Sequence, residues 1–340
     1  MKAALLGTPG SGRKTLMTAL NGGQSGTISA GRRNISTIRV PDPRIDWLAE
    51  VFRPKKTTWA TLELLFDDTP FESMGKRLNS ARSAEVLVIV TSAFGLGEDS
   101  AEVALEEADN FLDDMLLADQ IIVDKRLELL KKLGEKGQER KLFERLSAML
   151  EEGRHLGGVP FIDAELNLMK PYSFLTEKPV IVVLNVDEAE LENPMWSDVH
   201  ERIRKRGSLP LTLCAALEAE VATLDPSEQI EFLEAVGLSL PASHRLVQSV
   251  YSALNLISFF TVGEDEVRAW PVRKGAFAPE AAGRIHSDLQ RGFIRAEVVS
   301  YAHFQQVGSL AAARRTGRYR SEGKNYPIVD GDIINFLFNV

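Results

Sequence analysis

The first twenty residues, MKAALLGTPGSGRKTLMTAL (residues 1–20), decide the fold class. A short apolar run at Ala3–Leu6 leads into a glycine-rich turn, and a helical pattern follows from Arg13. This order of strand, loop and helix is typical of a phosphate-binding loop. In such a loop, backbone N–H groups and the helix N-terminus hold phosphate oxygens. The stretch therefore predicts a phosphate site in an α/β domain.

The loop departs from the usual pattern G-x-x-x-x-G-K-[ST] at two side chains. Arg13 stands where lysine normally reaches the phosphates, and Lys14 stands where a hydroxyl normally binds Mg²⁺. An ammonium group cannot ligate Mg²⁺, although a shift of one residue would place Lys14 on phosphate and Thr15 on the metal. The loop indicates either a nucleotide site or a loop kept for the fold. The residues expected to bind nucleotide are Gly7, Pro9, Gly10, Ser11, Gly12, Arg13, Lys14 and Thr15.

The composition is that of an ordinary globular protein. The chain has 340 residues, of which 44% are hydrophobic and 26% charged, and its net charge is −8. This charge excludes a nucleic-acid binder that works through its overall charge, and no DNA partner is evident. The single cysteine, Cys214, fits a reducing compartment, and no apolar run approaches the length of a membrane span. We expect a cytoplasmic protein without membrane spans, and its oligomeric state stays open.

Apolar runs along the chain alternate with helical patterns. Leu62–Phe66, Glu85–Thr91 and Val180–Asn185 resemble buried strands, and the last two contain the unbroken runs VLVIV and VIVVL that are typical of parallel strands covered on both faces. These runs predict a doubly wound α/β domain. Residues 100–156 carry two helical stretches around a Gly-Glu-Lys-Gly turn, which indicates a helical hairpin.

Four strand-like runs follow residue 256, and a helical pattern covers residues 278–292 between them. They predict a small α+β domain. The expected division is therefore a P-loop domain at residues 1–99 and 157–255, a helical insertion at 100–156 and a C-terminal domain at 256–340.

Longer segments carry a family resemblance. VPDPRIDWLAEVFRPKKTT (40–58), LNVDE (184–188), LCAALEAEVATL (213–224) and the C-terminal stretches FFTVGEDEVRAWPV, APEAAGRIHSDLQRGFIRAEVVS and DGDIINFLFNV are similar to the YchF / Obg-like ATPase family of P-loop NTPases. The resemblance implies a G domain, a coiled-coil insertion and a C-terminal TGS domain of the β-grasp fold. It also implies slow, potassium-stimulated hydrolysis of ATP in preference to GTP, and association with ribosomes.

The resemblance further implies roles for three residues of the Leu-Asn-Val-Asp-Glu segment. Asn185 would contact the purine base, the backbone of Val186 would lie near the ring, and Glu188 would help to discriminate the base. Without the flanking match, Asn185 alone would equally fit a polar cap that ends a strand.

The segment that follows the strand at Leu62–Phe66 departs from the family. Asp67 and Asp68 follow this strand, but neither has a glycine three residues later, and Pro70 has no N–H to sense a γ-phosphate. Asp67 is nevertheless, with Thr15, a candidate metal ligand. No histidine lies between residues 66 and 100, where related hydrolases place a catalytic one. We therefore expect weak or absent hydrolysis.

Basic residues near the C-terminus interleave with Tyr319 and Tyr326, and Glu322 is the only acidic residue from 312 to 326. Such a cluster predicts contacts with RNA phosphates and stacking on bases, although a solvated helix and loop would have the same sequence. The candidate RNA contacts are Arg314, Arg315, Arg318, Arg320 and Lys324.

Two functions fit these observations. In the first, the chain is a YchF-like protein that binds ATP or GTP, hydrolyses it weakly or not at all, and associates with the ribosome or RNA. In the second, it is a pseudo-NTPase, a scaffold that acts through protein or RNA contacts without nucleotide turnover.

Overall fold

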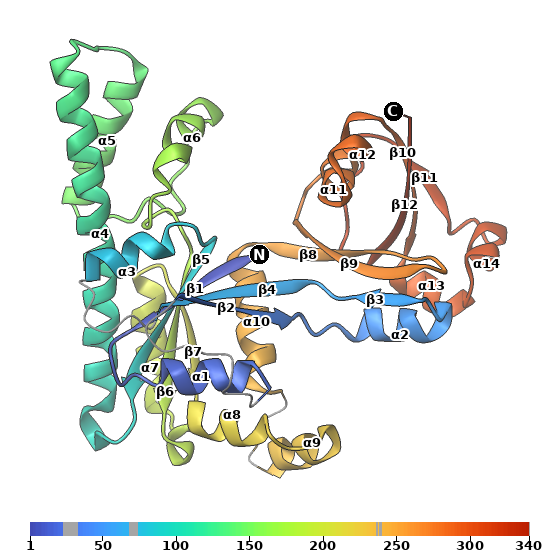
Figure 1. Cartoon of the computed structure of the whole chain (residues 1–340), viewed down its shortest axis with the longest axis horizontal. Helices are drawn as coiled ribbons and strands as arrows, with labels where there is room; N and C mark the ends of the chain where they lie inside the picture. The colour runs from blue at the N-terminus through green and yellow to red at the C-terminus, as the bar shows by residue number, and fades with distance from the viewer. Residues whose placement is uncertain (23–32, 68–73, 236, 238–239, 340) are drawn as a thin grey trace. The chain divides into compact units, whose positions relative to one another are not determined.

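A computed structural model describes residues 1–22, 33–67, 74–235, 237 and 240–339 (Figure 1). The chain forms two compact units. The first unit holds Met1–Ile38 and Leu62–Ala253, and the second holds Arg39–Thr61 and Leu254–Val340. Residues 39–61, which the sequence analysis groups with the P-loop domain, therefore lie in the second unit.

The first unit is built on a six-stranded sheet in the order β2-β4-β1-β5-β6-β7. β1 pairs in parallel with β4 and β5, and β5, β6 and β7 continue the parallel pairing. This sheet confirms the predicted α/β class. The strands are β1 (Lys2–Gly7), β2 (Arg33–Arg39), β4 (Thr61–Asp67), β5 (Val86–Ala93), β6 (Val180–Val186) and β7 (Leu209–Leu213).

Helices pack on both faces of this sheet. A large apolar core joins β1, β5 and β6 to α3, α4 and α7, while α1, α8 and α10 pack against one another and against β1, β6 and β7. Covering both faces explains the unbroken β-branched runs of β5 and β6. The helices are α1 (Arg13–Leu20), α3 (Met74–Ala81), α4 (Ser100–Lys132), α5 (Gln138–Glu151), α6 (Asp163–Met169), α7 (Met195–Lys205), α8 (Ala215–Val221), α9 (Pro226–Ala235) and α10 (Ala242–Ala253).

The helices α4 and α5 form a hairpin that projects from the sheet (Figure 1). Val123 and Leu127 of α4 pack with Phe143 and Leu146 of α5 in a separate core. The connecting turn starts at Gly134, whose φ of +69° is in the left-handed region that glycine favours. No helix within the described parts of the chain is long and apolar enough to cross a membrane.

The second unit is a six-stranded sheet in the order β11-β10-β12-β8-β9-β3. Its strands are β3 (Lys56–Thr58), β8 (Leu256–Thr261), β9 (Glu266–Arg273), β10 (Phe293–Ser300), β11 (Arg320–Glu322) and β12 (Asp332–Phe338). Its helices are α2 (Pro43–Phe52), α11 (Ala278–Ile285), α12 (Ser287–Arg291), α13 (Tyr301–Val307) and α14 (Leu310–Arg315). The single helix predicted over residues 278–292 is wrong. His286 adopts an extended backbone there, and its Nδ1 accepts a hydrogen bond from the Asp288 N–H.

Long-range contacts hold residues 39–61 in this second unit. Strand β3 pairs in parallel with β9, and the Arg44 guanidinium lies 2.7 Å from the Asp330 carboxylate. Trp47 of α2 packs edge-on against Tyr301 of α13 at 5.4 Å. These partners lie more than 200 residues away in the sequence, so no local pattern could reveal them.

Candidate nucleotide-binding site

The loop between β1 and α1 is shaped by glycines. Gly10 and Gly12 have φ values of +92° and +88°, a conformation that costs other L-residues energy, and Gly12 is the N-cap of α1. A side chain at Gly12 would overlap the side-chain amide of Asn185, and one at Gly7 would overlap the carbonyl oxygen of Val90. The close approach of other groups, as well as the backbone conformation, thus requires glycine at positions 7 and 12.

Asn185 at the end of β6 joins this loop to α8. Its side chain is buried; the amide nitrogen donates to the Ser11 carbonyl at 3.0 Å, and the amide oxygen accepts from the Ala215 N–H at 2.8 Å. These two bonds set the orientation of the amide and leave its second N–H for another acceptor. Val186 is buried beside it, and Glu188 is exposed at the start of a short 3₁₀ turn, Glu188–Glu190. The structure therefore brings Asn185 to the loop.

Arg13 turns toward the neighbouring strand β4. It is 8% exposed, and its guanidinium carbon lies 5.5 Å from the centroid of the Phe66 ring, a cation–π distance. Lys14 and Thr15 are exposed in the first turn of α1. Arg13, which stands at the position of the phosphate-binding lysine, is thus held partly by the Phe66 ring.

The side chain at the usual Mg²⁺ position of the loop is altered, and Thr15, one residue later, is the nearest hydroxyl along α1. Lys14 places an ammonium group where a hydroxyl would bind the ion. Within the described residues, no group of three His, Cys, Asp or Glu side chains is arranged to hold a metal. Asp67 ends β4, but its side chain and residues 68–73, which include Asp68 and Pro70, lie outside the described parts.

A carboxylate that the sequence analysis missed contacts the loop. Glu107 of α4 accepts a hydrogen bond from the Thr8 hydroxyl at 2.7 Å and another from the Ser92 N–H at 2.7 Å. It therefore links α4 to the loop and to β5. Glu107 is one of nine acidic residues in α4, and nothing in the local sequence distinguishes it from the others.

Comparison with known proteins decides the family. The family model YchF-GTPase_C, described as a protein of unknown function (DUF933), matches residues 256–339. The ribosome-binding ATPase YchF of Haemophilus influenzae is 34% identical over an alignment of 363 residues, which covers 100% of this chain and 99% of that protein. The chain belongs to the YchF family.

Two further YchF proteins match this chain over nearly its full length. The ribosome-binding ATPase YchF of Bacillus subtilis is 33% identical and covers 100% of both chains. The solved structure of the Schizosaccharomyces pombe YchF GTPase matches with a TM-score of 0.85 at 26% identity, covering 99% of this chain and 97% of that one. The family resemblance inferred from the sequence is thereby confirmed.

The basic cluster of this YchF family member lies in the second unit, on α14, β11 and the loops beside them. All five of its predicted RNA-contact residues are exposed, namely Arg314, Arg315, Arg318, Arg320 and Lys324. Exposed cations close together on one segment are suited to phosphate contacts.

The two tyrosines of this cluster are already paired. Arg314 lies 4.7 Å from the Tyr319 ring centroid, and Arg320 lies 5.7 Å from that of Tyr326. The Tyr326 hydroxyl donates to Asp332 at 2.8 Å. Burial, followed by this bond, raises the pKa of Tyr326 to about 12. Each tyrosine ring of the cluster therefore has an arginine beside it.

Proposed function

We propose that this YchF family member binds a purine nucleotide, ATP or GTP, at the loop Gly7–Thr15. The observation that supports this most is the Asn185 side chain, which joins the loop backbone to the segment expected to contact the base. Loop N–H groups and the N-terminus of α1 would hold the phosphates, since the first N–H groups of a helix point out of its end. Asn185 would donate its second N–H to the base, with Glu188 nearby.

We further propose that hydrolysis is weak or absent, although the relatives are named ATPases. Lys14 replaces the magnesium-binding hydroxyl, and Arg13 packs on Phe66. The Glu107 carboxylate on Thr8 adds negative charge beside a site for anions. Each lost electrostatic contact costs roughly a hundredfold in rate, so several losses together would leave turnover undetectable.

Titration calorimetry with non-hydrolysable ATP and GTP analogues, each with and without Mg²⁺, tests this proposal. Micromolar binding that does not depend on Mg²⁺ is expected, because the Lys14 ammonium supplies positive charge near the phosphates. Lys14→Thr restores the hydroxyl and should make the affinity depend on Mg²⁺. If neither analogue binds at millimolar concentration, the nucleotide proposal is refuted and the pseudo-NTPase scaffold is the function that fits.

We also propose that the second unit is a TGS domain that contacts ribosomal RNA through its basic cluster. A protein with this partner would work in the cytoplasm. The relatives are named ribosome-binding ATPase YchF, which supports this proposal, as do the five exposed cations. Arg314→Gln, Arg315→Gln and Arg318→Gln together should lower ribosome affinity and reduce the salt dependence of binding by about one unit of slope per lost contact. Arg284→Gln with Arg291→Gln, on other helices of the same unit, is the control. Equal effects of both sets would contradict the proposal.

A further inference from the structure

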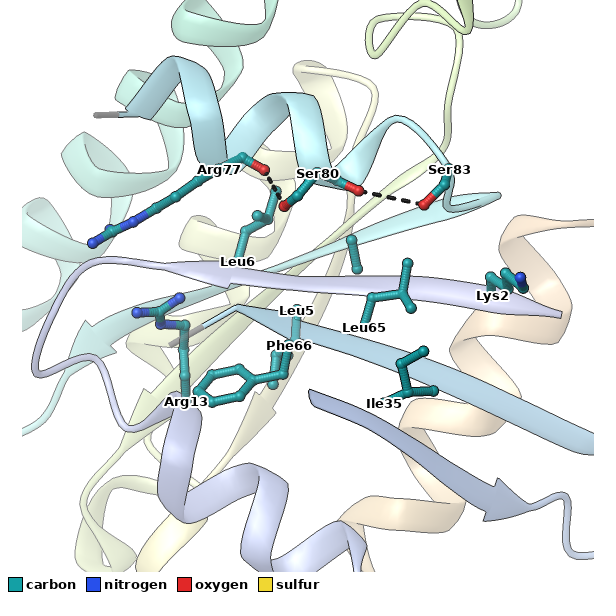
Figure 2. A pocket seen from close by; sticks show the side chains of 11 residues that line it. Lys2, Leu5, Leu6, Arg13, Ile35, Leu65, Phe66, Arg77, Ser80 and Ser83 are labelled. Carbon is teal, nitrogen blue, oxygen red and sulfur yellow. Dashed lines mark hydrogen bonds between the residues drawn. The ribbon is translucent and has the colours of Figure 1, made fainter. Parts of the chain in front are cut away.

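A pocket of about 220 Å³ lies between α3 and the β2–β4–β1 side of the first unit's sheet (Figure 2). Leu65 of β4 and Ile35 of β2 form part of its apolar wall, and Ile35 is 65% exposed. Arg13, Arg77 and Lys2 supply its positive charges. The pocket is thus apolar along the sheet and cationic at its ends.

Two arginines lie at one end of this pocket. Figure 2 shows the guanidinium groups of Arg13 and Arg77 directed toward the end of β1 at which the phosphate loop begins, with Lys2 at the opposite end. The Nε atom of Arg77 is buried and has no hydrogen-bond partner among the described residues. A buried donor without an acceptor is unfavourable, so the Arg77 side chain would be stabilised by turning this N–H toward an anion in the pocket.

The serines and the lysine of the pocket have partners in the structure. Ser80 and Ser83 donate their hydroxyls to backbone carbonyls, as the dashed lines in Figure 2 show. The Lys2 ammonium lies 3.6 Å from the Glu63 carboxylate, which offsets its charge. The pocket therefore recognises negative charge mainly at its arginine end.

We propose that the α3 pocket binds a small amphiphilic carboxylate. Its anionic group would lie between Arg13 and Arg77, and its apolar body would lie along Leu65 and Ile35 toward Lys2. A cavity of about 150 Å³ can hold benzene, so the volume of this pocket, about 220 Å³, suits a short acyl chain or a single aromatic ring.

This pocket shares Arg13 with the phosphate loop. A carboxylate that holds Arg13 against β4 would keep its charge away from a bound phosphate, so the two ligands would compete. The predicted competition between the two ligands rests on the proposed nucleotide function, whereas binding of the carboxylate itself does not.

Octanoate and its neutral counterpart octanamide, titrated into the full chain and followed by NMR, test the pocket directly. Octanoate should bind saturably, and octanamide at least tenfold more weakly, because it lacks the charge. Arg77→Gln should weaken octanoate at least tenfold, whereas Arg204→Gln, at an exposed position of α7, should leave it unchanged. Ile35→Glu, on an exposed side chain, should block the apolar part without unfolding the protein. Equal affinities for octanoate and octanamide, or no effect of Arg77→Gln, would overturn the proposal.

A second titration separates binding of the carboxylate from its competition with the nucleotide. With a saturating ATP analogue present, the apparent octanoate affinity should fall several-fold in the unaltered protein. If octanoate binds but a bound analogue leaves its affinity unchanged, sharing of Arg13 is contradicted while the pocket stands. If the analogue does not bind at all, the proposed nucleotide function fails, and the octanoate result still decides the pocket.

Discussion

Replacing Asn185 by alanine should destabilise the first unit as well as weaken nucleotide binding. The Asn185 side chain is 5% exposed and bonds to two backbone groups, the Ser11 carbonyl and the Ala215 N–H. Truncation would leave both groups buried without partners, at about 1–3 kcal/mol each. The expected loss in free energy of unfolding is therefore about 2–6 kcal/mol, which is a large part of the stability of a typical domain.

Urea denaturation, with hydrogen exchange of first-unit peptides as the probe, measures this loss. Asn185→Asp is the sharper variant, because it keeps the acceptor for Ala215 but places a carboxylate oxygen opposite the Ser11 carbonyl. It should destabilise at least as much as Asn185→Ala. Asn110→Ala, on an exposed side chain of α4, is the matched control and should stay within about 0.5 kcal/mol. A loss below about 1 kcal/mol for both Asn185 variants would show that the amide does not hold the loop, and would refute the reasoning.

Three further predictions concern other parts of the chain. Gly12→Ala should lower the free energy of unfolding, measured in urea, by at least about 2 kcal/mol more than Gly10→Ala. Both glycines have a positive φ, but only Gly12 faces another side chain, that of Asn185. Equal losses would argue against the close approach of Asn185 to Gly12. Asp119→Ala should destabilise by about 3–5 kcal/mol, since it leaves the Arg82 guanidinium, 2.7 Å away, without its buried partner; Asp124→Ala, at an exposed position, is its control in the same assay. The pKa of Tyr326 is raised to about 12, above its ordinary value of about 10, so its contribution to stability is complete below pH 10 and is lost between about pH 10 and 12. Tyr326→Phe should flatten the fall of the second unit's melting temperature across that range, and an unchanged fall would contradict the assignment.

The local part of the fold could be predicted because its signals are short-range. The apolar runs of β5 and β6 are buried on both sides only when both faces of the sheet are covered, and that character is visible in five consecutive residues of each strand. The glycines of the loop are visible for the same reason, since a positive φ is a property of one residue. The long helix α4 and the turn at Gly134 follow from apolar spacing and a helix-ending glycine.

The candidate site could be predicted only as a set of positions. Arg13 stays a predicted phosphate contact, but its place beside the Phe66 ring depends on how close β4 lies to α1, which the sequence does not record. The tyrosines of the basic cluster stay predicted base contacts, but the closeness of Arg314 and Arg320 to their rings could not be predicted. A side chain with several rotatable bonds can reach many partners, and the sequence does not say which partner is near.

By itself, the sequence determined four strands of each sheet, the long helix, the glycine loop and the family of this protein, because each is recorded in contiguous residues. Only the tertiary structure decided that residues 39–61 join the second unit, that Glu107 contacts Thr8, and that Arg13 and Arg77 meet in one pocket. These contacts join residues that are far apart in the chain. Their energies depend on distances and burial that exist only after the chain has folded.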